Sequence, residues 1–447
     1  MSEVIVAKAG GTSNSDAEAV SLSMLWANQS DIFVCSAPGR LEDDGPASAK
    51  VTDNLLLARQ QYTQTGEVES GLTDIITQRF SSIVRGLGKT VNLPPTWIDS
   101  IAPRVREAVH HSEDAASMLG ERLQAEIYEG AGWELLDPGR AHNDLGADQD
   151  LWRKWLNEAF VPGRKYILPG NTTKVDDHLK TFSRGGSDIS GGLAAFGIRA
   201  DININLTDSQ AMSADPRLIA TDKLQPIDHL LYEEGRELGR NGTGLIHPAA
   251  MVPLMLGNIP TEVRSTFQPV SPATLLDNDS ARASRREGRV VALSLMENMV
   301  VHRVHEPGMA EKIGRLASFE SVLAREGVRL VDSRGDGVDA QKYFVESKQS
   351  ELAGTVLRTA TQGGSVETSD ELSFITLVGY RLDRRMLDNI ISIARNSVLN
   401  SKVWQSQGHD LSNGRHSIRI SVNPEDARTT FERLHFSSIE YPAQTVT

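Results

Sequence analysis

The segment 183–188, SRGGSD, places a guanidinium and a carboxylate on either side of two glycines and a serine. Arg184 can grip a carboxylate with two hydrogen bonds, the glycines expose backbone N–H groups, and Ser187 and Asp188 add polar anchors. Such a set suits the binding of a small zwitterionic acid. A Gly-Gly turn with charged flanks is also a common surface loop, so this segment alone leaves both interpretations open.

A second glycine turn follows the apolar run 3–7 near the N-terminus. Lys8 stands at the end of that run, and Gly10, Gly11 and Thr12 come directly after it. A transferring phosphoryl group needs an ammonium beside a turn of N–H groups, because the protein mainly positions that group and neutralises its charge. A surface lysine before an ordinary glycine turn would give the same pattern, and Thr12 could simply cap a helix.

The composition limits the classes of protein to be considered. A chain of 447 residues is too long for one hydrophobic core, so we expect two or three domains. The net charge of -13 argues against nonspecific nucleic-acid binding. The single cysteine, Cys35, excludes a disulfide framework and favours a buried, inert thiol in a reducing cytoplasm. Neither a stretch of roughly 20 apolar residues nor a signal-peptide pattern is present, so we expect no membrane partner.

Strand and helix patterns alternate along residues 1–275. Apolar, β-branched runs predict strands at 3–7, 32–37, 166–169 and 202–206, and helical patterns mark 53–64, 72–83 and 115–129. This alternation predicts an α/β fold in which helices sandwich a sheet. A buried parallel strand that delivers a glycine turn to a helix N-terminus would present backbone donors to phosphate.

A charged, serine-rich segment, 271–289, marks a domain boundary. Beyond it, two apolar strand starts at 290–295 and 374–379 suggest that one small unit of strands and helices occurs twice. In the second copy, Asn423 and Pro424 predict the N-terminus of a last helix. The order of elements there, strand-helix-strand-strand-helix, is typical of a small regulatory α/β module.

Six short segments, in this order, resemble the aspartate kinase family. They are KAGGTS (8–13), VTDNLL (51–56), LGE (119–121), SRGGSD (183–188), TD with SADPR (207–208 and 213–217) and HPA (247–249). The C-terminal part looks like the paired ferredoxin-like ACT domains that follow the kinase domain in this family. The resemblance implies an amino acid kinase domain at 1–280 and ACT-like modules at 281–365 and 366–447.

The resemblance also implies roles for individual residues. Lys8 and Asp188 would be catalytic, the lysine by stabilising the phosphoryl group and the aspartate by organising the site. Glu121 would receive the substrate's amino group and Arg184 its carboxylate, with Thr52 and Ser187 as further substrate contacts. The resemblance implies ATP with Mg²⁺ as cofactors, held by Gly10, Gly11, Thr12, Ser36, Thr207, Asp208 and Arg217.

Several of these residues have a simpler interpretation. Glu121 could belong to a solvated helical face, Asp208 to a turn after a strand, and Arg217 to a surface loop. His247, before a proline, is expected to pack the fold rather than to transfer protons. No pair of histidines or cysteines has the spacing of metal ligands.

The chain departs from the family pattern at several positions. Ala9 replaces a phenylalanine, and the nucleotide loop 209–217 is one residue shorter and lacks its tyrosine. Gly244 stands where a lysine normally neutralises phosphate charge, a loss that could cost several kcal/mol unless another group compensates. Asn171 stands where an aromatic usually follows glycine, so the substrate pocket could be reshaped.

The main hypothesis is an ATP-dependent kinase that phosphorylates the side-chain carboxylate of L-aspartate, the first step towards lysine, threonine and methionine. One alternative is an aspartokinase-like enzyme with a changed acceptor or nucleotide. Another is a catalytically weakened amino-acid-binding regulatory protein, which the loss at Gly244 favours. The ACT-like modules could sense an amino-acid effector, and the resemblance implies a homodimer or higher homo-oligomer.

Overall fold

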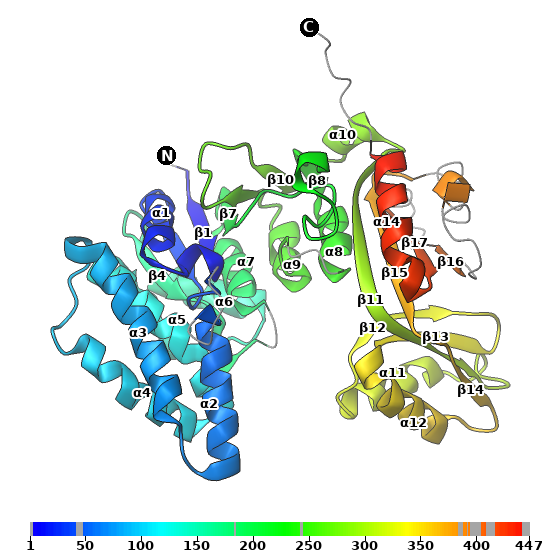
Figure 1. The fold of residues 1–447 in the computed structure, drawn as a ribbon, viewed down its shortest axis with the longest axis horizontal. Coiled ribbons are helices and arrows are strands. Elements are labelled where there is room, and N and C mark those ends of the chain that lie inside the picture. Colours follow the sequence, from blue (N-terminus) through cyan, green and yellow to red (C-terminus); the bar gives the residue numbers. More distant parts are fainter. Residues whose placement is uncertain are drawn as a thin grey trace, which may run out of the picture. The chain divides into compact units, whose positions relative to one another are not determined.

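The structure is a computed structural model (Figure 1), and it describes residues 3–41, 48–182, 185–241, 245–382, 388–390, 392–393, 404–407 and 416–439. The chain divides into two structural units. The first comprises 1–211, 226–236 and 244–280, and the second comprises 212–225, 237–243 and 281–447. Arg184 and Gly244 of the sequence predictions lie outside the described residues.

The first unit is built on an eight-stranded sheet with the order β3-β4-β2-β1-β7-β9-β10-β8. Its strands are β1 (Ile5–Ala9), β2 (Ile32–Cys35), β3 (Glu134–Leu135), β4 (Tyr166–Pro169), β7 (Ile202–Thr207), β8 (His229–Leu231), β9 (Thr261–Ser265) and β10 (Thr274–Asp277). Neighbouring strands from β3 to β9 are parallel, and β10 runs antiparallel to β9. A short hairpin, β5 (Thr172–Val175) and β6 (His178–Thr181), lies outside this sheet.

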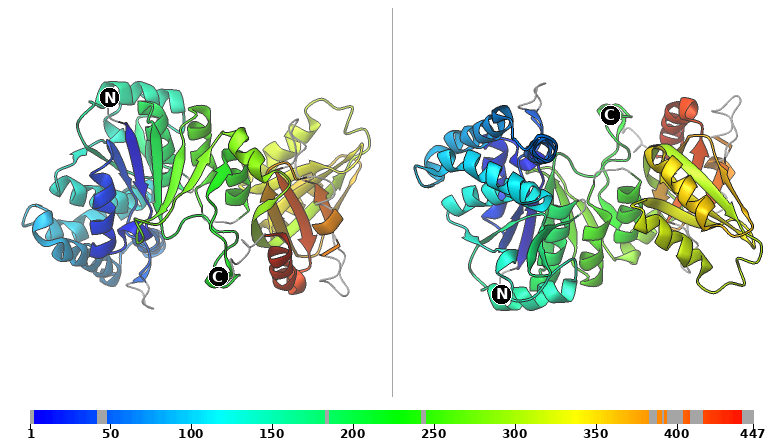
Figure 2. Two further views of the ribbon diagram at one scale, coloured as in Figure 1. Left: turned by 90° about the horizontal axis from the view of Figure 1, so that it is seen from above. Right: turned by 90° about the horizontal axis from the view of Figure 1, so that it is seen from below.

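Helices cover both faces of this sheet, as Figure 2 shows. They are α1 (Ala17–Ala27), α2 (Val51–Thr65), α3 (Ser70–Leu87), α4 (Trp97–His111), α5 (Glu113–Gly130), α6 (Gln149–Ala159), α7 (Gly186–Ile198), α8 (Tyr232–Arg240) and α9 (Pro248–Leu256). One core joins α1 to α5 to Ala7, Phe33 and Ile167 of the sheet. On the other face, α7 packs against β1 and β2 and is flanked by α6 and α9. The α/β sandwich predicted from the sequence is confirmed.

The central strands are buried because both faces of a parallel sheet are covered. All four residues of β2 are buried, and Cys35 within it is a free, buried thiol whose pKa is raised well above its usual value, mainly by burial. The structure therefore agrees with the buried, inert thiol that the sequence predicted. The first strand begins and ends later than predicted, so Lys8 lies within β1 rather than after it.

The second unit contains a seven-stranded antiparallel sheet with the order β12-β13-β11-β15-β17-β16, and β14 also pairs with β11. Its strands are β11 (Val290–His305), β12 (Leu330–Gly335), β13 (Ala340–Glu346), β14 (Ser365–Thr368), β15 (Leu372–Gly379), β16 (Trp404–Gln407) and β17 (Ser417–Val422). The helices are α10 (Ser280–Ala283), at the boundary of the two units, α11 (Arg315–Arg325), α12 (Ser350–Ala360) and α14 (Pro424–Ser438).

Two of the hydrophobic cores on this sheet lie beneath its helices. Phe319, Tyr343 and Leu357 lie in the core beneath α11 and α12, whereas Ile375 and Phe431 lie in the core beneath α14. The long strand β11 serves both, because its first half pairs with β15 and its second half with β13. The sequence prediction of two small α+β modules is confirmed, and the two modules share a strand.

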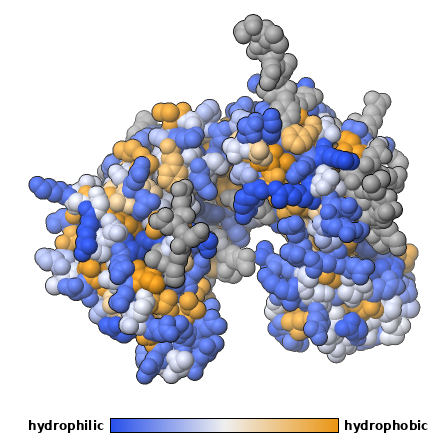
Figure 3. Space-filling view, in the orientation of Figure 1, coloured by the Kyte–Doolittle hydropathy of each residue, from blue (hydrophilic) through white to orange (hydrophobic). Residues whose placement is uncertain are grey.

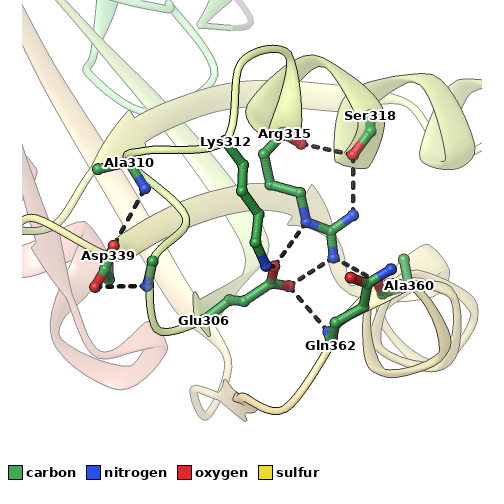
Figure 4. Close-up of polar contacts among 9 residues, drawn as sticks. Glu306, Ala310, Lys312, Arg315, Ser318, Asp339, Ala360 and Gln362 are labelled. Atoms are coloured by element: carbon green, nitrogen blue, oxygen red, sulfur yellow. Dashed lines mark hydrogen bonds and ion pairs between the residues drawn. The ribbon is translucent and has the colours of Figure 1, made fainter.

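A buried carboxylate, that of Glu306, connects several segments of the module that contains α11 and α12 (Figure 4). Glu306, fully buried, accepts hydrogen bonds from Lys312 (2.9 Å), from Arg315 (2.5 Å to Nη2) and from the backbone N–H of Gln362 (2.9 Å). Asp339 accepts from the backbone N–H groups of Gly308 and Ala310 in the same loop. The two carboxylates therefore fix the connection between β11 and α11.

On the face seen in Figure 3, hydrophilic residues predominate and apolar residues are interspersed among them. Within the described ranges, no helix combines the length and the apolar composition that a membrane-spanning segment requires.

Candidate active site

The predicted site residues of the first unit gather where β1, β2, β4 and β7 end. The chain runs from β1 to β2 on one side of β1, and β7 lies on its other side. In an open parallel sheet, ligands bind outside the carboxyl ends of the strands at such a change in strand order. The loops after these strands carry Gly10, Ser36, Asn171 and Asp208.

Lys8 and Asp188 form an ion pair at this edge. The ammonium of Lys8 in β1 lies 2.5 Å from Oδ1 of Asp188 in the first turn of α7, and both side chains are largely buried. The other oxygen of Asp188 accepts a hydrogen bond from the backbone N–H of His247 (3.0 Å). Gly191 of α7 lets the helix approach Lys8, since a Cβ there would lie 3.2 Å from Lys8 Cβ. The pair that the sequence predicted to be catalytic is thus brought together.

The two glycine turns that follow β1 and β2 lie against each other. The N–H of Gly39 donates to the carbonyl of Gly11 (2.8 Å), and a Cβ at Gly39 would lie 2.5 Å from the carbonyl carbon of Gly11. Gly10 donates its N–H to the carbonyl of Leu206 in β7 (3.2 Å). Thr12 is exposed at the end of the turn. A backbone without side chains here fits close approach by phosphate oxygens.

Glu121 of α5 is 5% exposed, so the solvated-face interpretation is wrong. Burial raises the pKa of its carboxyl to about 8, while backbone N–H groups, including that of Ala37, oppose the shift. Among the described residues, its Oε2 atom has no hydrogen-bond partner. A buried carboxyl oxygen without a partner is costly, and a ligand ammonium would satisfy it.

Consecutive residues link Glu121 to the ion pair. Ala37 donates to Glu121, and its neighbour Ser36 donates a hydroxyl hydrogen bond to Ser187 (2.7 Å), which precedes Asp188. Ser36 was predicted to contact nucleotide and Ser187 to contact substrate, and they lie in direct contact. Thr52 is half-buried in the first turn of α2, which begins where the N–H of Val51 donates to the carbonyl of Pro38.

The predicted nucleotide residues divide between the two units. Thr207 ends β7 and donates to Oδ1 of the exposed Asp208 (2.7 Å), whose carbonyl accepts from Ser265 (2.8 Å). Arg217 belongs to the second unit and forms an ion pair with Asp215 (2.5 Å). The contact of Arg217 with nucleotide stays a prediction. The same holds for the other residues that the sequence analysis assigned to nucleotide binding.

The described residues hold no group of three or more histidine, cysteine, aspartate or glutamate side chains arranged to bind a metal ion. The site combines the Lys8–Asp188 ion pair, the buried carboxyl of Glu121 with its unpartnered Oε2 atom, and two glycine turns at a single sheet edge.

The model of the amino acid kinase family matches residues 3–265. The chain belongs to the amino acid kinase family. Aspartokinase 3 of Bacillus subtilis is 30% identical over 260 residues, which are 54% of this chain and 56% of that protein. Lysine-sensitive aspartokinase 3 of Escherichia coli is 25% identical and is aligned over 98% of this chain and 100% of its own length.

A solved structure gives the same result for the fold. The crystal structure of E. coli aspartokinase III in complex with aspartate and ADP matches with a TM-score of 0.77 at 20% identity, over 98% of this chain and all of that chain. The resemblance to aspartate kinases stated from six short segments is confirmed.

One position of this amino acid kinase, Asn14, has a role that the sequence analysis did not predict. Asn14 is fully buried; its amide donates to the carbonyls of Ala9 and Gly10, and its Oδ1 accepts from Tyr128 (3.0 Å). It thereby connects the glycine turn after β1 to α5. An asparagine three residues after Gly11 is the sequence signal that could have indicated this.

His247 behaves as expected from the sequence, as a structural residue. Its Nδ1 accepts from the N–H of Ala249 at the start of α9, and its own N–H holds Asp188. Gly185, with a φ of 62°, lies so close to the imidazole that any Cβ there would overlap it.

Proposed function

We propose that this protein is an aspartate kinase, which transfers the γ-phosphoryl group of ATP to the side-chain carboxylate of L-aspartate. The observation that carries this proposal is the arrangement of Lys8, Asp188 and Glu121 at one sheet edge. A phosphoryl-transfer site needs a positioned cation, and an amino-acid acceptor needs a carboxylate for its ammonium. The products are 4-phospho-L-aspartate and ADP.

Glu121 binds the ammonium of the acceptor in this proposal. Its unpartnered oxygen gains a charge-assisted hydrogen bond, and the ammonium favours the ionised form of the carboxyl. Ser187 and the first turn of α7 face the other end of the acceptor, together with Arg184, as the family resemblance implies. The acceptor thus lies between α5 and α7.

In the chemical step, an oxygen of the acceptor carboxylate attacks the γ-phosphorus. The bond from that phosphorus to the bridging oxygen breaks, and ADP leaves with the bridging oxygen and its charge. Lys8 stabilises the charge on the transferring group, and Asp188 holds the ammonium in place. The carboxylate is ionised near neutral pH, so no strong general base is required. ATP enters as its Mg²⁺ complex.

Regulation and assembly follow from the same proposal. The ACT-like modules would bind an amino-acid effector that favours one state of the enzyme over another, and one E. coli relative is lysine-sensitive by name. We also propose a homodimer or higher homo-oligomer in the cytoplasm, where ATP and aspartate are available.

ADP formation with Mg-ATP tests the proposal, measured with L-aspartate, with L-glutamate and without an acceptor. We expect turnover that depends on L-aspartate and is lost in Lys8→Met. Lys165→Met, which changes an exposed lysine at the start of β4, is the matched control and should keep its rate. Acceptor-independent or absent turnover by the folded wild type would favour the regulatory or changed-acceptor alternatives.

A further inference from the structure

Three acidic or hydroxyl side chains form a stripe along α5. Asp114, Ser117 and Glu121 are three and four residues apart, so they lie on one face of the helix. Glu121 is the proposed ammonium site, whereas the function proposed above uses neither Asp114 nor Ser117. Asp114 contacts the β5–β6 hairpin, and Ser117 contacts Asn171 directly before it.

Both strands of the hairpin are attached to this stripe at the open end of the hairpin, where Thr172 pairs with Thr181. Asp114 accepts hydrogen bonds from the N–H of Thr181 (2.9 Å) and from its hydroxyl (2.7 Å). The amide of Asn171, directly before β5, donates to the hydroxyl of Ser117 (3.4 Å). The helix α7 begins at Gly186, shortly after the hairpin ends at Thr181.

Asn171 also touches α7 directly. Its φ is 56°, in the left-handed region that asparagine tolerates better than most residues. Its side chain fills the space beside Gly186, the first residue of α7, so that a Cβ on Gly186 would overlap Oδ1 of Asn171. One side chain therefore bridges α5, one turn before Glu121, and α7, two residues before Asp188.

We propose that Asn171 is a specificity-determining residue that sets the length of acceptor the site admits. Its contacts with Ser117 and Gly186 define the gap between the ammonium site on α5 and the N-terminus of α7. L-glutamate is longer than L-aspartate by one methylene. In the proposed binding mode this extra length lies along the gap between α5 and α7. The inference rests on the proposed function, since it concerns the acceptor of that reaction.

Asn171→Gly is the informative variant, because glycine removes the side chain and keeps the positive φ without strain. We expect the ratio of kcat/KM for L-aspartate to that for L-glutamate to fall about tenfold, within the range of about 10- to 200-fold that one methylene commands in specific pockets. The KM for L-aspartate should rise, while the KM for ATP stays unchanged because the nucleotide side is not touched.

Ser117→Ala removes only the hydroxyl and should lower the same ratio by a smaller factor. The double variant should be no worse than Asn171→Gly alone, because both changes delete one shared contact. The matched control is Asn203→Ala, which deletes a buried asparagine amide that donates to Thr261 in the sheet (3.2 Å). It should lower the unfolding temperature without changing the acceptor ratio.

An unchanged ratio in Asn171→Gly, or an equal loss with both acceptors together with a higher KM for ATP, would overturn the inference. Wild-type turnover with L-aspartate is measured first, and its absence would contradict the proposed function instead. In that case calorimetric binding of the two amino acids to the wild type and to Asn171→Gly still decides the role of Asn171: a changed preference supports the inference, and an unchanged one overturns it.

Discussion

The ammonium of Lys8 lies 2.5 Å from a carboxylate oxygen of Asp188, and this ion pair joins the central strand of the sheet to the first turn of α7. Lys8 is paired in β1 with Val34 and Asn205, so its backbone is held from both sides. The cation is therefore placed before any nucleotide binds, as electrostatic stabilisation of a transition state requires.

Asp188→Asn tests how much the position of the Lys8 ammonium contributes to the rate. An amide cannot hold the ammonium as strongly, and a misplacement of about 1 Å in an active site can lower the rate about 100-fold. We expect kcat to fall by about this factor, with smaller changes in both KM values. Steady-state kinetics check this, and Asp150→Asn, at an exposed position of α6, should behave as the wild type. A kcat within threefold or so of the wild type would refute the placement role.

The pH dependence of L-aspartate binding follows from the burial of Glu121. Its pKa is raised to about 8, mainly by burial, so the free site is protonated below that pH and must lose a proton to accept an ammonium. The KM for L-aspartate should therefore fall as pH rises from 6 to 8. Glu121→Gln should raise the KM strongly and abolish this dependence. A KM of the wild type that is flat over this interval would contradict the assignment.

The same group affects stability with a definite sign. A carboxyl whose pKa is about 8 in the folded protein and 4.5 in the unfolded chain makes folding take up a proton. The stabilisation is complete below pH 4.5 and is lost as pH rises through 8. Glu121→Gln should thus flatten the decline of the unfolding temperature between pH 5 and 8, measured without ligand. An equally steep decline in the variant would be inconsistent with this.

Gly39→Ala should disrupt the contact between the two glycine turns that follow β1 and β2. The added Cβ would lie 2.5 Å from the carbonyl carbon of Gly11, and backbone on both sides leaves no flexible group to move away. We expect a KM for ATP at least about tenfold higher, with the KM for L-aspartate less affected. Gly71→Ala in α3 is the control, because nothing lies within 4 Å of the added atom. Equal kinetics in the two variants would argue against contact between the turns.

Glu306→Gln should destabilise the second unit. The hydrogen bonds from Arg315 lower the pKa of Glu306 to about 2, so the stabilisation is present above pH 4.5 and is lost as pH falls through 2. Removing one partner of a buried ion pair costs about 3–5 kcal/mol. Urea unfolding at pH 7 checks this, with Glu297→Gln, at an exposed position of the preceding strand β11, as control. A shift as small as that of the control would show that the cluster in Figure 4 adds little stability.

Much of the first unit could be predicted because the strands β1, β2, β4 and β7 are short and mostly apolar and buried. The β4 strand has the predicted bounds, and β7 extends one residue further than predicted. The helices α4 and α6 were not predicted, although the N-cap Asp148 marks the start of α6. Short segments that combine glycine with charged residues predicted the candidate site. Lys8 contacts Asp188, and Ser187 contacts the predicted site residue Ser36.

The second unit was harder to predict for a physical reason. The sequence analysis identified only the start of β11, at 290–295, because the apolar pattern breaks at Glu297 and Asn298. In the structure the pairing shifts register between Met296 and Met299, and Asn298 has a φ of 58°. A β-bulge lets a strand continue through polar residues with a sharper twist, and local periodicity does not reveal it. Asn171 likewise acts through contacts distant in sequence.

The most direct test of the central claim is identification of the product. The wild-type enzyme is incubated with Mg-ATP, L-aspartate and hydroxylamine, which converts an acyl phosphate to a stable hydroxamate, and the product is analysed by mass spectrometry. The account predicts the β-hydroxamate of aspartate, in amounts equal to the ADP formed, and none from Lys8→Met. ADP formed without hydroxamate, or no ADP from a folded enzyme, would contradict it.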